Sequence, residues 1–439
     1  MIAHKISQEH IGTNHSLPVL NRKHTRFIFI FICLFAVGCA TQLHAQPCPG
    51  DVFREYNMVG GGSNGEKGAE WADEFVFISH HTGERSTKGD RSFHNIDLEH
   101  AVKAEFVAGY WGGHIGSSNR RVVFNDNPAV QLPLIKNTPT RPECYFSQQC
   151  RAACDIPLDY LNQGENKFRL EVDDQICYSF NWGWFWTNQV VLRVYYDSSK
   201  VEHPFGTIDT PQANSTITGF SRISCKIERG NVDYVEFIGK YRDFSWGGSG
   251  EFNTWHGIFW MKDTTLQRHI GTSSGLFPYL DWNNRWIPDQ KDMKIAARLV
   301  DKSGMIYMTE AVDNITLAHQ DRVMKMYTSS DVPENFATQT DSAICTINIP
   351  DDLGEGFIAK LVMSTFSGGP SDRQVYINDI PIVKGGWGNW HRLAFCEEYV
   401  PVKVLKQGEN EIKIKANMPG EHAFEVNWPG PVLFVEFNK

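Results

Sequence analysis

The stretch PLDYLNQGEN at residues 157–166 returns as PVKVLKQGEN at residues 401–410. Two further landmarks accompany each copy in the same order: NDNP at 125–128 and NWGW at 181–184 in the first copy, NDIP at 378–381 and NWPG at 427–430 in the second. Three shared landmarks in one order are typical of a repeated fold unit. We therefore expect the same domain near both ends of the chain.

Each copy has the pattern of antiparallel β structure. Short alternating runs rich in Val, Ile, Phe and Tyr are separated by Gly, Asn, Asp and Pro, and long helical periodicity is almost everywhere missing. The runs Val190–Tyr196 and Pro431–Phe437 close the two copies. Asn125-Asp126 and Asn378-Asp379 directly follow strand runs, so each pair predicts a hairpin turn.

The size and charge of the chain restrict its organisation and its partners. It has 439 residues, of which 41% are hydrophobic, and this is enough for three domains with cores of their own. The net charge is −9, and no basic run follows the leader. These features argue against nucleic acid and anionic membrane surfaces as partners.

Residues 1–45 predict an N-terminal extension with an export signal. Basic residues precede the apolar stretch Phe27–Cys39, which is too short to span a bilayer, so we expect no transmembrane span. Two processing sites compete, because cleavage after Ala45 and a lipobox-like Ala36–Cys39 both fit. The second would leave Cys39 acylated, as in a lipoprotein with an outer-membrane lipid anchor. Either route predicts a secreted, periplasmic or cell-surface protein.

The repeated landmarks resemble the galactose-binding-like β-sandwich, a jelly-roll module common in secreted carbohydrate-active proteins. The resemblance lies in a strand, an Asn-rich hairpin with a Pro, a Gly-Glu-Asn turn and a closing strand, and it covers residues 70–198 and 325–439. The first copy has an insertion around residues 138–150 that the second lacks.

The region between the copies has a different pattern. Pro204–Pro211, Val232–Phe237 and Ala311–Leu317 resemble, in their order, bacterial immunoglobulin-like domains, which usually act as spacers. The chain is thus expected to be all-β, with two galactose-binding-like β-sandwiches at 46–200 and 321–439, separated by an immunoglobulin-like β-sandwich at 204–320.

Eight cysteines follow the leader, and in an exported chain they are disulfide candidates. Cys345 and Cys396 are the only pair in the last copy, so we expect a bridge between them. A zinc site at Cys144, Cys150 and Cys154 would lack a Cys-x-x-Cys motif and a nearby His pair. We therefore expect neither a metal nor a cofactor.

Aromatic clusters are the main functional signal. Trp182, Trp184 and Trp186 alternate along the sequence, so a strand would place all three on one face. Planar rings stack on the apolar face of a sugar, while nearby Asn or Asp side chains bind its hydroxyls. The alternative is that these rings fill the sandwich core or an interface with the middle domain.

Two Gly-rich stretches carry further candidates. Trp111 and His114 follow a strand run, and a packed aromatic in a flexible loop is the alternative there. Residues 385–391 lack apolar periodicity and predict a surface loop. The predicted glycan contacts are Trp111, His114, Trp182, Trp184, Trp387, Trp390 and His391. Two such sites on a stiff spacer would gain avidity on a polymer.

The middle region is also rich in Trp, at positions 246, 255, 282 and 286, beyond what one immunoglobulin-like core needs. We expect these rings to pack the three domains into a rigid unit, in preference to a third ligand site.

No catalytic signature of similar strength is present. Gly-x-Ser-x-Gly, the P-loop and His-Glu-x-x-His are absent, and no carboxylate pair is marked for glycosidic hydrolysis. The sequence favours an exported bacterial carbohydrate-binding protein that takes part in polysaccharide recognition or degradation without its own catalysis. One alternative is a polysaccharide lyase or glycoside hydrolase with its site in the first β-sandwich, where His80, His94 and His100 lie. The other is a structural or adhesive surface protein.

Overall fold

The computed structural model describes residues 47–59, 76–79, 91–112, 115–177, 183–259, 264–367, 373–384, 392–416 and 423–439. Within these residues the regular structure consists of β-strands and short 3-10 turns, so the predicted all-β class is confirmed. No helix in this part of the chain is long and apolar enough to cross a membrane.

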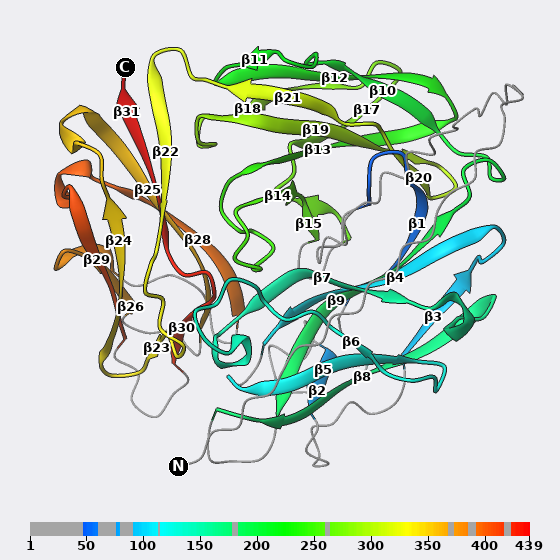
Figure 1. Ribbon diagram of the computed structural model, residues 1–439, viewed down its shortest axis with the longest axis horizontal. Coiled ribbons are helices and arrows are strands. Elements are labelled where there is room, and N and C mark those ends of the chain that lie inside the picture. Colours follow the sequence, from blue (N-terminus) through cyan, green and yellow to red (C-terminus); the bar gives the residue numbers. More distant parts are fainter. Residues whose placement is uncertain are drawn as a thin grey trace, which may run out of the picture. The chain divides into compact units, whose positions relative to one another are not determined.

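The first copy, which we call the first sandwich, forms two facing sheets (Figure 1). One contains β2 (Val76–Ser79), β9 (Trp184–Tyr196), β4 (Ala101–Trp111) and β7 (Gln148–Ile156). The other contains β3 (Arg91–Ile96), β8 (Gly164–Gln175), β5 (Ser117–Phe124) and β6 (Val130–Gln131). Two 3-10 turns, η1 (Pro142–Cys144) and η2 (Leu158–Tyr160), lie in its connections.

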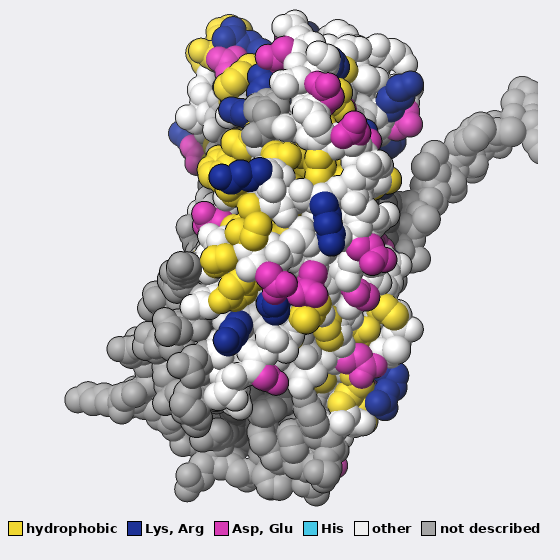
Figure 2. All heavy atoms as spheres, turned by 90° about the vertical axis from the view of Figure 1, so that its left-hand side faces the viewer, with side chains coloured by type: hydrophobic (Ala, Val, Ile, Leu, Met, Phe, Trp, Pro, Cys, Tyr) yellow, Lys and Arg dark blue, Asp and Glu magenta, His cyan; other side chains and the backbone are white. Residues whose placement is uncertain are grey.

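The second copy, the last sandwich, repeats this plan. Its larger sheet contains β22 (Arg322–Thr328), β31 (Val432–Asn438), β25 (Gly356–Ser367), β30 (Phe424–Val426), β23 (Ala337–Thr338) and β28 (Arg392–Val400). The facing sheet contains β24 (Ser342–Ile349), β29 (Gly408–Ala416), β26 (Arg373–Ile377) and β27 (Ile380–Lys384), and the 3-10 turns are η3 (Leu353–Glu355) and η4 (Val402–Val404). On the side shown in Figure 2, acidic, basic and apolar side chains are interspersed, without a patch of one charge.

Between the sandwiches lies a middle unit that also has two sheets. Its first sheet contains β13 (Val232–Arg242), β14 (Asn253–His256), β17 (Gly271–Ser274), β19 (Gln290–Asp301), β20 (Met305–Met308), β21 (Val312–Leu317) and β11 (Thr216–Ile217). The second sheet contains β10 (Phe205–Thr210), β12 (Phe220–Arg229) and β18 (Tyr279–Asn283), and a small ribbon pairs β15 (Ile258–Phe259) with β16 (Leu266–Gln267).

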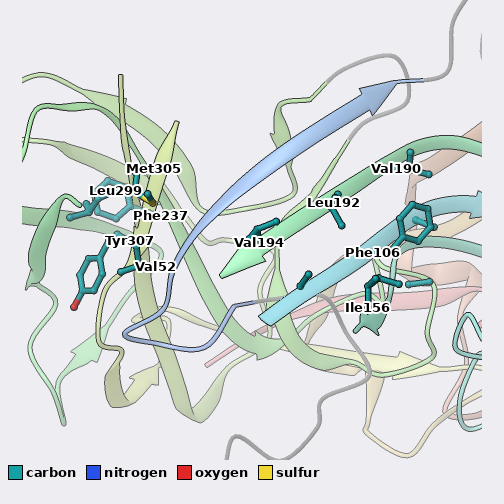
Figure 3. Packing of buried hydrophobic residues seen from close by; sticks show 14 of the residues in the cluster. Val52, Phe106, Ile156, Val190, Leu192, Val194, Phe237, Leu299, Met305 and Tyr307 are labelled. Carbon is teal, nitrogen blue, oxygen red and sulfur yellow. The ribbon is translucent and has the colours of Figure 1, made fainter. Parts of the chain in front are cut away.

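One strand, β1 (Val52–Val59), joins the first sandwich to the middle unit. It pairs with β9 on one side and with β20 on the other, so a single sheet continues through both units. The apolar core is continuous as well, because Val52 lies beside Tyr307 while Leu192 and Phe106 pack farther along the same cluster (Figure 3). These two units therefore share one core.

The landmarks of the repeat are structural. Asn125 and Asn378 begin the predicted hairpin turns, with φ values of 46° and 51°, which confirms the turns. In the first sandwich the Asn125 amide donates to Oδ1 of the buried Asn166 at 2.8 Å, and in the last one Asn378 donates to Asn410 at 2.9 Å. We call each pair an asparagine clamp. Each clamp connects the hairpin turn to the Gly-Glu-Asn turn, so the repeated Asn residues stabilise the fold of both copies.

A buried ladder of charges crosses the continuous sheet. Arg193 of β9 contacts Glu105 of β4 at 3.0 Å and Glu55 of β1 at 2.7 Å. Glu55 also contacts Arg298 of β19 at 2.7 Å, and Arg298 lies 3.1 Å from Glu236 of β13. All five side chains are at most about a tenth exposed. Charges this deep persist only when they are paired, so the ladder fixes the first sandwich on the middle unit.

The predicted bridge between Cys345 and Cys396 is wrong. Cys345 lies on β24, where its Sγ contacts Ser329 Oγ at 3.5 Å. Cys396 lies on β28 in the facing sheet, where its Sγ contacts Thr365 Oγ1 at 3.4 Å. The two buried thiols therefore face different hydroxyl groups in opposite sheets and are not joined.

Candidate functional site

The two sandwiches are in direct contact, and aromatic rings form that contact. Trp111 at the end of β4 stacks on Phe366 near the end of β25, with ring centroids 4.0 Å apart and planes 19° apart. Trp186 of β9 packs against both rings, at 5.0 Å and 5.5 Å. Together with Leu393 of β28, these residues make a small cluster that we call the junction.

Burial at the junction corrects one predicted ligand contact. Trp111 is only 3% exposed and is covered by Phe366, so its ring face is not available to a saccharide. Trp186, for which packing was the alternative, is also 3% exposed. The copies therefore meet directly, and the middle unit does not separate two independent sites as expected of a spacer.

The other predicted contacts lie in segments bordered by the junction strands. Trp182 precedes β9, His114 follows β4, and residues 385–391, with Trp387, Trp390 and His391, precede β28; all of these lie outside the described residues. Trp184 begins β9, and its side chain is likewise not described. These contacts stay predictions. The junction does bring together the strand ends that border them, since Trp111 pairs with Trp186 and Phe366 pairs with Leu393.

The insertion that distinguishes the first copy builds the contact between the sandwiches. Tyr145 packs on Trp428 of the last sandwich at 5.0 Å, edge to face. The Phe146 carbonyl accepts a hydrogen bond from the Trp428 backbone N–H at 2.7 Å, and Gln148 Oε1 accepts one from Ser364 Oγ at 2.7 Å. The insertion was visible in the sequence, but its contacts with the last sandwich were not.

A disulfide fastens this insertion. Cys144 is bonded to Cys177, 33 residues later in the chain. Cys177 directly precedes the segment that carries Trp182. The same bond excludes the zinc site considered for Cys144, and no cluster of metal-binding side chains occurs among the described residues.

One carboxyl group at the junction has no hydrogen-bond partner. Glu425 of β30 is paired with Phe366 in the sheet, so its side chain lies on the same face as that ring. It is 7% exposed, and its Oε2 atom has no partner in the described part of the chain. Burial raises the pKa of Glu425 well above the ordinary value of a glutamate. Such a group is a functional-site candidate, because a fold gains nothing from an unsatisfied buried acid.

Each of the two sandwiches has a further unsatisfied polar atom. Asn427, which directly follows β30, donates to Ser364 Oγ at 3.1 Å, but its Oδ1 atom has no partner among the described residues. Gln189 Nε2 on β9 is also buried without one. Unsatisfied polar atoms of this kind are one element that saccharide recognition needs, and an accessible ring face is the other. Glu425 and Asn427 were missed in the sequence, although Asn427 belongs to a repeated landmark.

Two of the Trp residues of the middle unit, Trp246 and Trp255, pack the units together as predicted. Trp246 lies against Phe395 of the last sandwich at 5.4 Å, and Trp255 belongs to the apolar cluster shared with the first sandwich. Trp246 and Trp255 are 6% and 7% exposed.

No family profile matches this sequence, and no curated protein is similar to it. Among solved structures, the chain is similar to a β-porphyranase of glycoside hydrolase family 86 from Bacteroides plebeius, with 14% identity, a TM-score of 0.22, and 56% of this chain and 38% of that one covered. It is also similar to an exo-β-1,3-galactanase from Phanerochaete chrysosporium, with 10% identity, a TM-score of 0.17, and 73% and 68% covered. This chain spans little more than a third of the length of the family 86 enzyme. Similarity at these TM-scores carries no argument about function.

Proposed function

We propose that the protein is an exported bacterial carbohydrate-binding protein that recognises a polysaccharide at the junction of its two sandwiches, without catalysis of its own. The proposal also takes the two copies to be galactose-binding-like and the middle unit to be immunoglobulin-like. The observation that carries it is the buried, unpartnered carboxyl of Glu425 at the place where the two copies meet. In both copies, a segment that contains Trp residues directly precedes a strand of the junction: Trp182 precedes β9, and Trp387 and Trp390 precede β28.

The chemistry of the junction supports a sugar ligand. A protonated Glu425 has one O–H donor and free acceptor capacity, so it pairs with the hydroxyl groups of a saccharide. Indole rings supplied by Trp182 and Trp387 would stack on the sugar, and each stacked ring contributes about 1 kcal/mol. Because the two copies are in contact, the rings of both would contribute binding free energy within one site, instead of forming two separate weak sites.

Gel electrophoresis through a panel of dissolved polysaccharides tests the proposal. We expect at least one polymer to retard the protein, and we expect Trp387→Ala, Trp182→Ala and Glu425→Gln each to reduce that retardation. Tyr279→Ala is the matched control, because Tyr279 is a 52% exposed ring on the middle unit, remote from the junction in the sheet order.

The same samples distinguish binding from catalysis. The polymer that retards the protein is incubated with it and assayed for new reducing ends and for the ultraviolet absorbance of unsaturated uronate. Binding without either product supports the proposal. Cleavage by the purified protein would favour the lyase or hydrolase alternative, and migration unaffected by every polymer would favour a structural or adhesive role.

A further inference from the structure

A hollow lies between the middle unit and the last sandwich, away from the junction. It has a volume of about 170 Å³. The middle unit contributes Asp243, Trp246, Arg268 and Trp286 to its wall, and the last sandwich contributes Lys360 and Glu397. The volume lies below the roughly 300–1,000 Å³ of pockets for drug-sized ligands, so the hollow has space for one small ring.

Charged side chains in the hollow are arranged around one carboxylate. Glu397 accepts from Arg268 Nη1 at 2.6 Å through one oxygen and from Lys360 Nζ at 2.9 Å through the other. Burial alone would raise the pKa of Glu397, but Lys360 and Arg268 outweigh burial and lower it. The carboxylate is thus ionised and held in a fixed position, with lone pairs that these two bonds do not use.

The same cations lie on aromatic rings. The Arg268 guanidinium is 3.9 Å from the centre of the Trp246 ring, and Lys360 Nζ is 4.8 Å from that of Trp286. Trp286 is half-buried and packs at 5.6 Å from Tyr399, whose ring is 60% exposed. Tyr399 therefore offers an open aromatic face beside the hollow.

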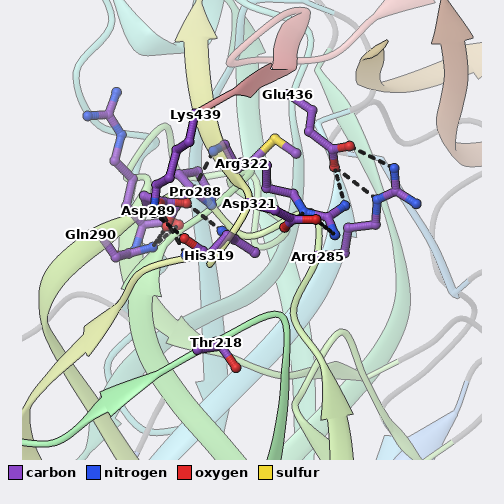
Figure 4. A network of polar contacts seen from close by, with 12 residues as sticks. Thr218, Arg285, Pro288, Asp289, Gln290, His319, Asp321, Arg322, Glu436 and Lys439 are labelled. Carbon is purple, nitrogen blue, oxygen red and sulfur yellow. Dashed lines mark hydrogen bonds and ion pairs between the residues drawn. The ribbon is translucent and has the colours of Figure 1, made fainter. Parts of the chain in front are cut away.

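The walls of the hollow are held in place on both sides. Next to Trp286, Arg285 makes a two-pronged ion pair with the fully buried Glu436 of β31, at 2.8 Å and 2.9 Å (Figure 4). Arg322 contacts the same carboxylate at 3.3 Å. A site that is organised before its ligand arrives loses less entropy on binding.

We infer that this hollow binds a single ring of a neutral saccharide through two adjacent hydroxyl groups. One hydroxyl donates to Glu397, and its neighbour accepts from Lys360 or Arg268, while the ring lies against Tyr399 and Trp286. The inference rests on the proposed carbohydrate-binding function and adds a second site to it.

The positive and negative charges in the wall of the hollow are balanced. Arg268 and Lys360 are matched by Glu397 and Asp243, and burial lowers the pKa of His269, the remaining ionisable group of the wall beside Tyr241, to about 4. The wall therefore has little net charge at neutral pH, so it gives an anionic sugar no advantage over a neutral one.

The two sites are connected by the same strands. Lys360 at the hollow and Phe366 at the junction are six residues apart on β25, which corresponds to about 20 Å of extended strand. A polysaccharide that reaches both places would gain avidity from one rigid body.

Indole N–H signals of the ¹⁵N-tryptophan-labelled protein give a direct test with simple probes. We expect methyl glucopyranoside, methyl galactopyranoside or methyl xylopyranoside at millimolar concentration to shift the Trp286 signal, which Trp286→Phe assigns. Glucuronate should bind no more tightly than the neutral glycosides. A stronger response to glucuronate would overturn the neutral class, and no Trp286 shift with any glycoside would overturn the site.

Two variants locate the binding. Tyr399→Ala removes an exposed ring, so it should weaken binding severalfold without unfolding the protein, and Tyr279→Ala, a similarly exposed ring elsewhere, should have no effect. Glu397→Gln should weaken binding about tenfold, as expected for a lost hydrogen bond to a charged group. Glu411→Gln, on β29 of the facing sheet, is its charge-matched control. Polymer retardation with no indole shift would remove only this inference, whereas loss of both would remove the proposed function as well.

Discussion

The first and last sandwiches share one internal framework and differ in what surrounds it. Both contain the asparagine clamp, with nearly equal distances of 2.8 Å and 2.9 Å. Only the first sandwich has the insertion with the Cys144–Cys177 bond and the charge ladder through Arg193. The repeated residues therefore maintain the fold, whereas the residues that are not repeated connect the units of this protein to one another.

The charge ladder provides the largest expected effect. Arg193→Met leaves the buried Glu105 without its main charge partner and the buried Glu55 with Arg298 alone, which should cost about 3–5 kcal/mol of unfolding free energy. Urea unfolding measures it. Arg169→Met, which breaks more exposed pairs with Asp126 and Glu171, should cost about 1 kcal/mol or less. Equal losses in the two variants would show that the ladder does not join the units.

The disulfide of the insertion comes next. Replacing Cys144 and Cys177 together by Ser opens a loop of 33 residues, which should lower the unfolding free energy by about 3 kcal/mol. A reducing agent should lower the urea midpoint of the wild type more than that of the double variant, in which the Cys144–Cys177 bond is already absent. If the urea midpoints of wild type and variant coincide, the insertion is held by its packing on Trp428 alone.

The asparagine clamp should give similar effects in both copies. Asn166→Ala and Asn410→Ala each remove a fully buried side chain and leave backbone partners unsatisfied, at a cost of about 2–3 kcal/mol. Melting temperatures of the two variants provide the comparison. If only one variant has a lower melting temperature, the asparagine clamp does not stabilise the other copy.

A smaller effect concerns pH. Burial raises the pKa of Asp243 to about 6, although its hydrogen bond from Trp246 Nε1 at 2.9 Å acts in the opposite direction. A raised folded-state pKa stabilises the protein at low pH, and this contribution disappears as pH rises from about 4 to 6. Asp243→Asn cannot titrate, so the wild type should lose stability relative to it over this interval, by about 1 kcal/mol or more. A difference in urea midpoint that does not change with pH would contradict this assignment.

The fold was readable from the sequence because its signals are local. Turn residues such as Asn378, which has a positive φ, and alternation such as that in 411–415 need no knowledge of distant contacts. Contacts between residues that are far apart in the sequence cannot be predicted from such local signals. The expected Cys345–Cys396 bridge failed because spacing alone does not reveal that the thiols face different hydroxyl groups.

The candidate site was only partly readable for the same reason. Trp111 was expected to face solvent, but Phe366, 255 positions later, covers it. Glu425 and Glu397 belong to no recognisable sequence motif. Only the packing of the units leaves Glu425 Oε2 without a hydrogen-bond partner and places the Glu397 carboxylate between Arg268 and Lys360. The composition shows that the chain is rich in aromatic residues, but tertiary contacts decide which of their side chains are exposed to solvent.

Glu425 gives the most direct test of glycan binding at the junction, through the urea midpoint of the wild type and Glu425→Gln with and without a polysaccharide that retards the wild type. Because the raised pKa of Glu425 destabilises the folded state as pH rises, the variant should gain stability relative to the wild type at alkaline pH. A ligand that binds only the folded state raises the midpoint. The account predicts that the polymer stabilises the wild type and stabilises the variant much less. Equal stabilisation of both proteins would contradict it.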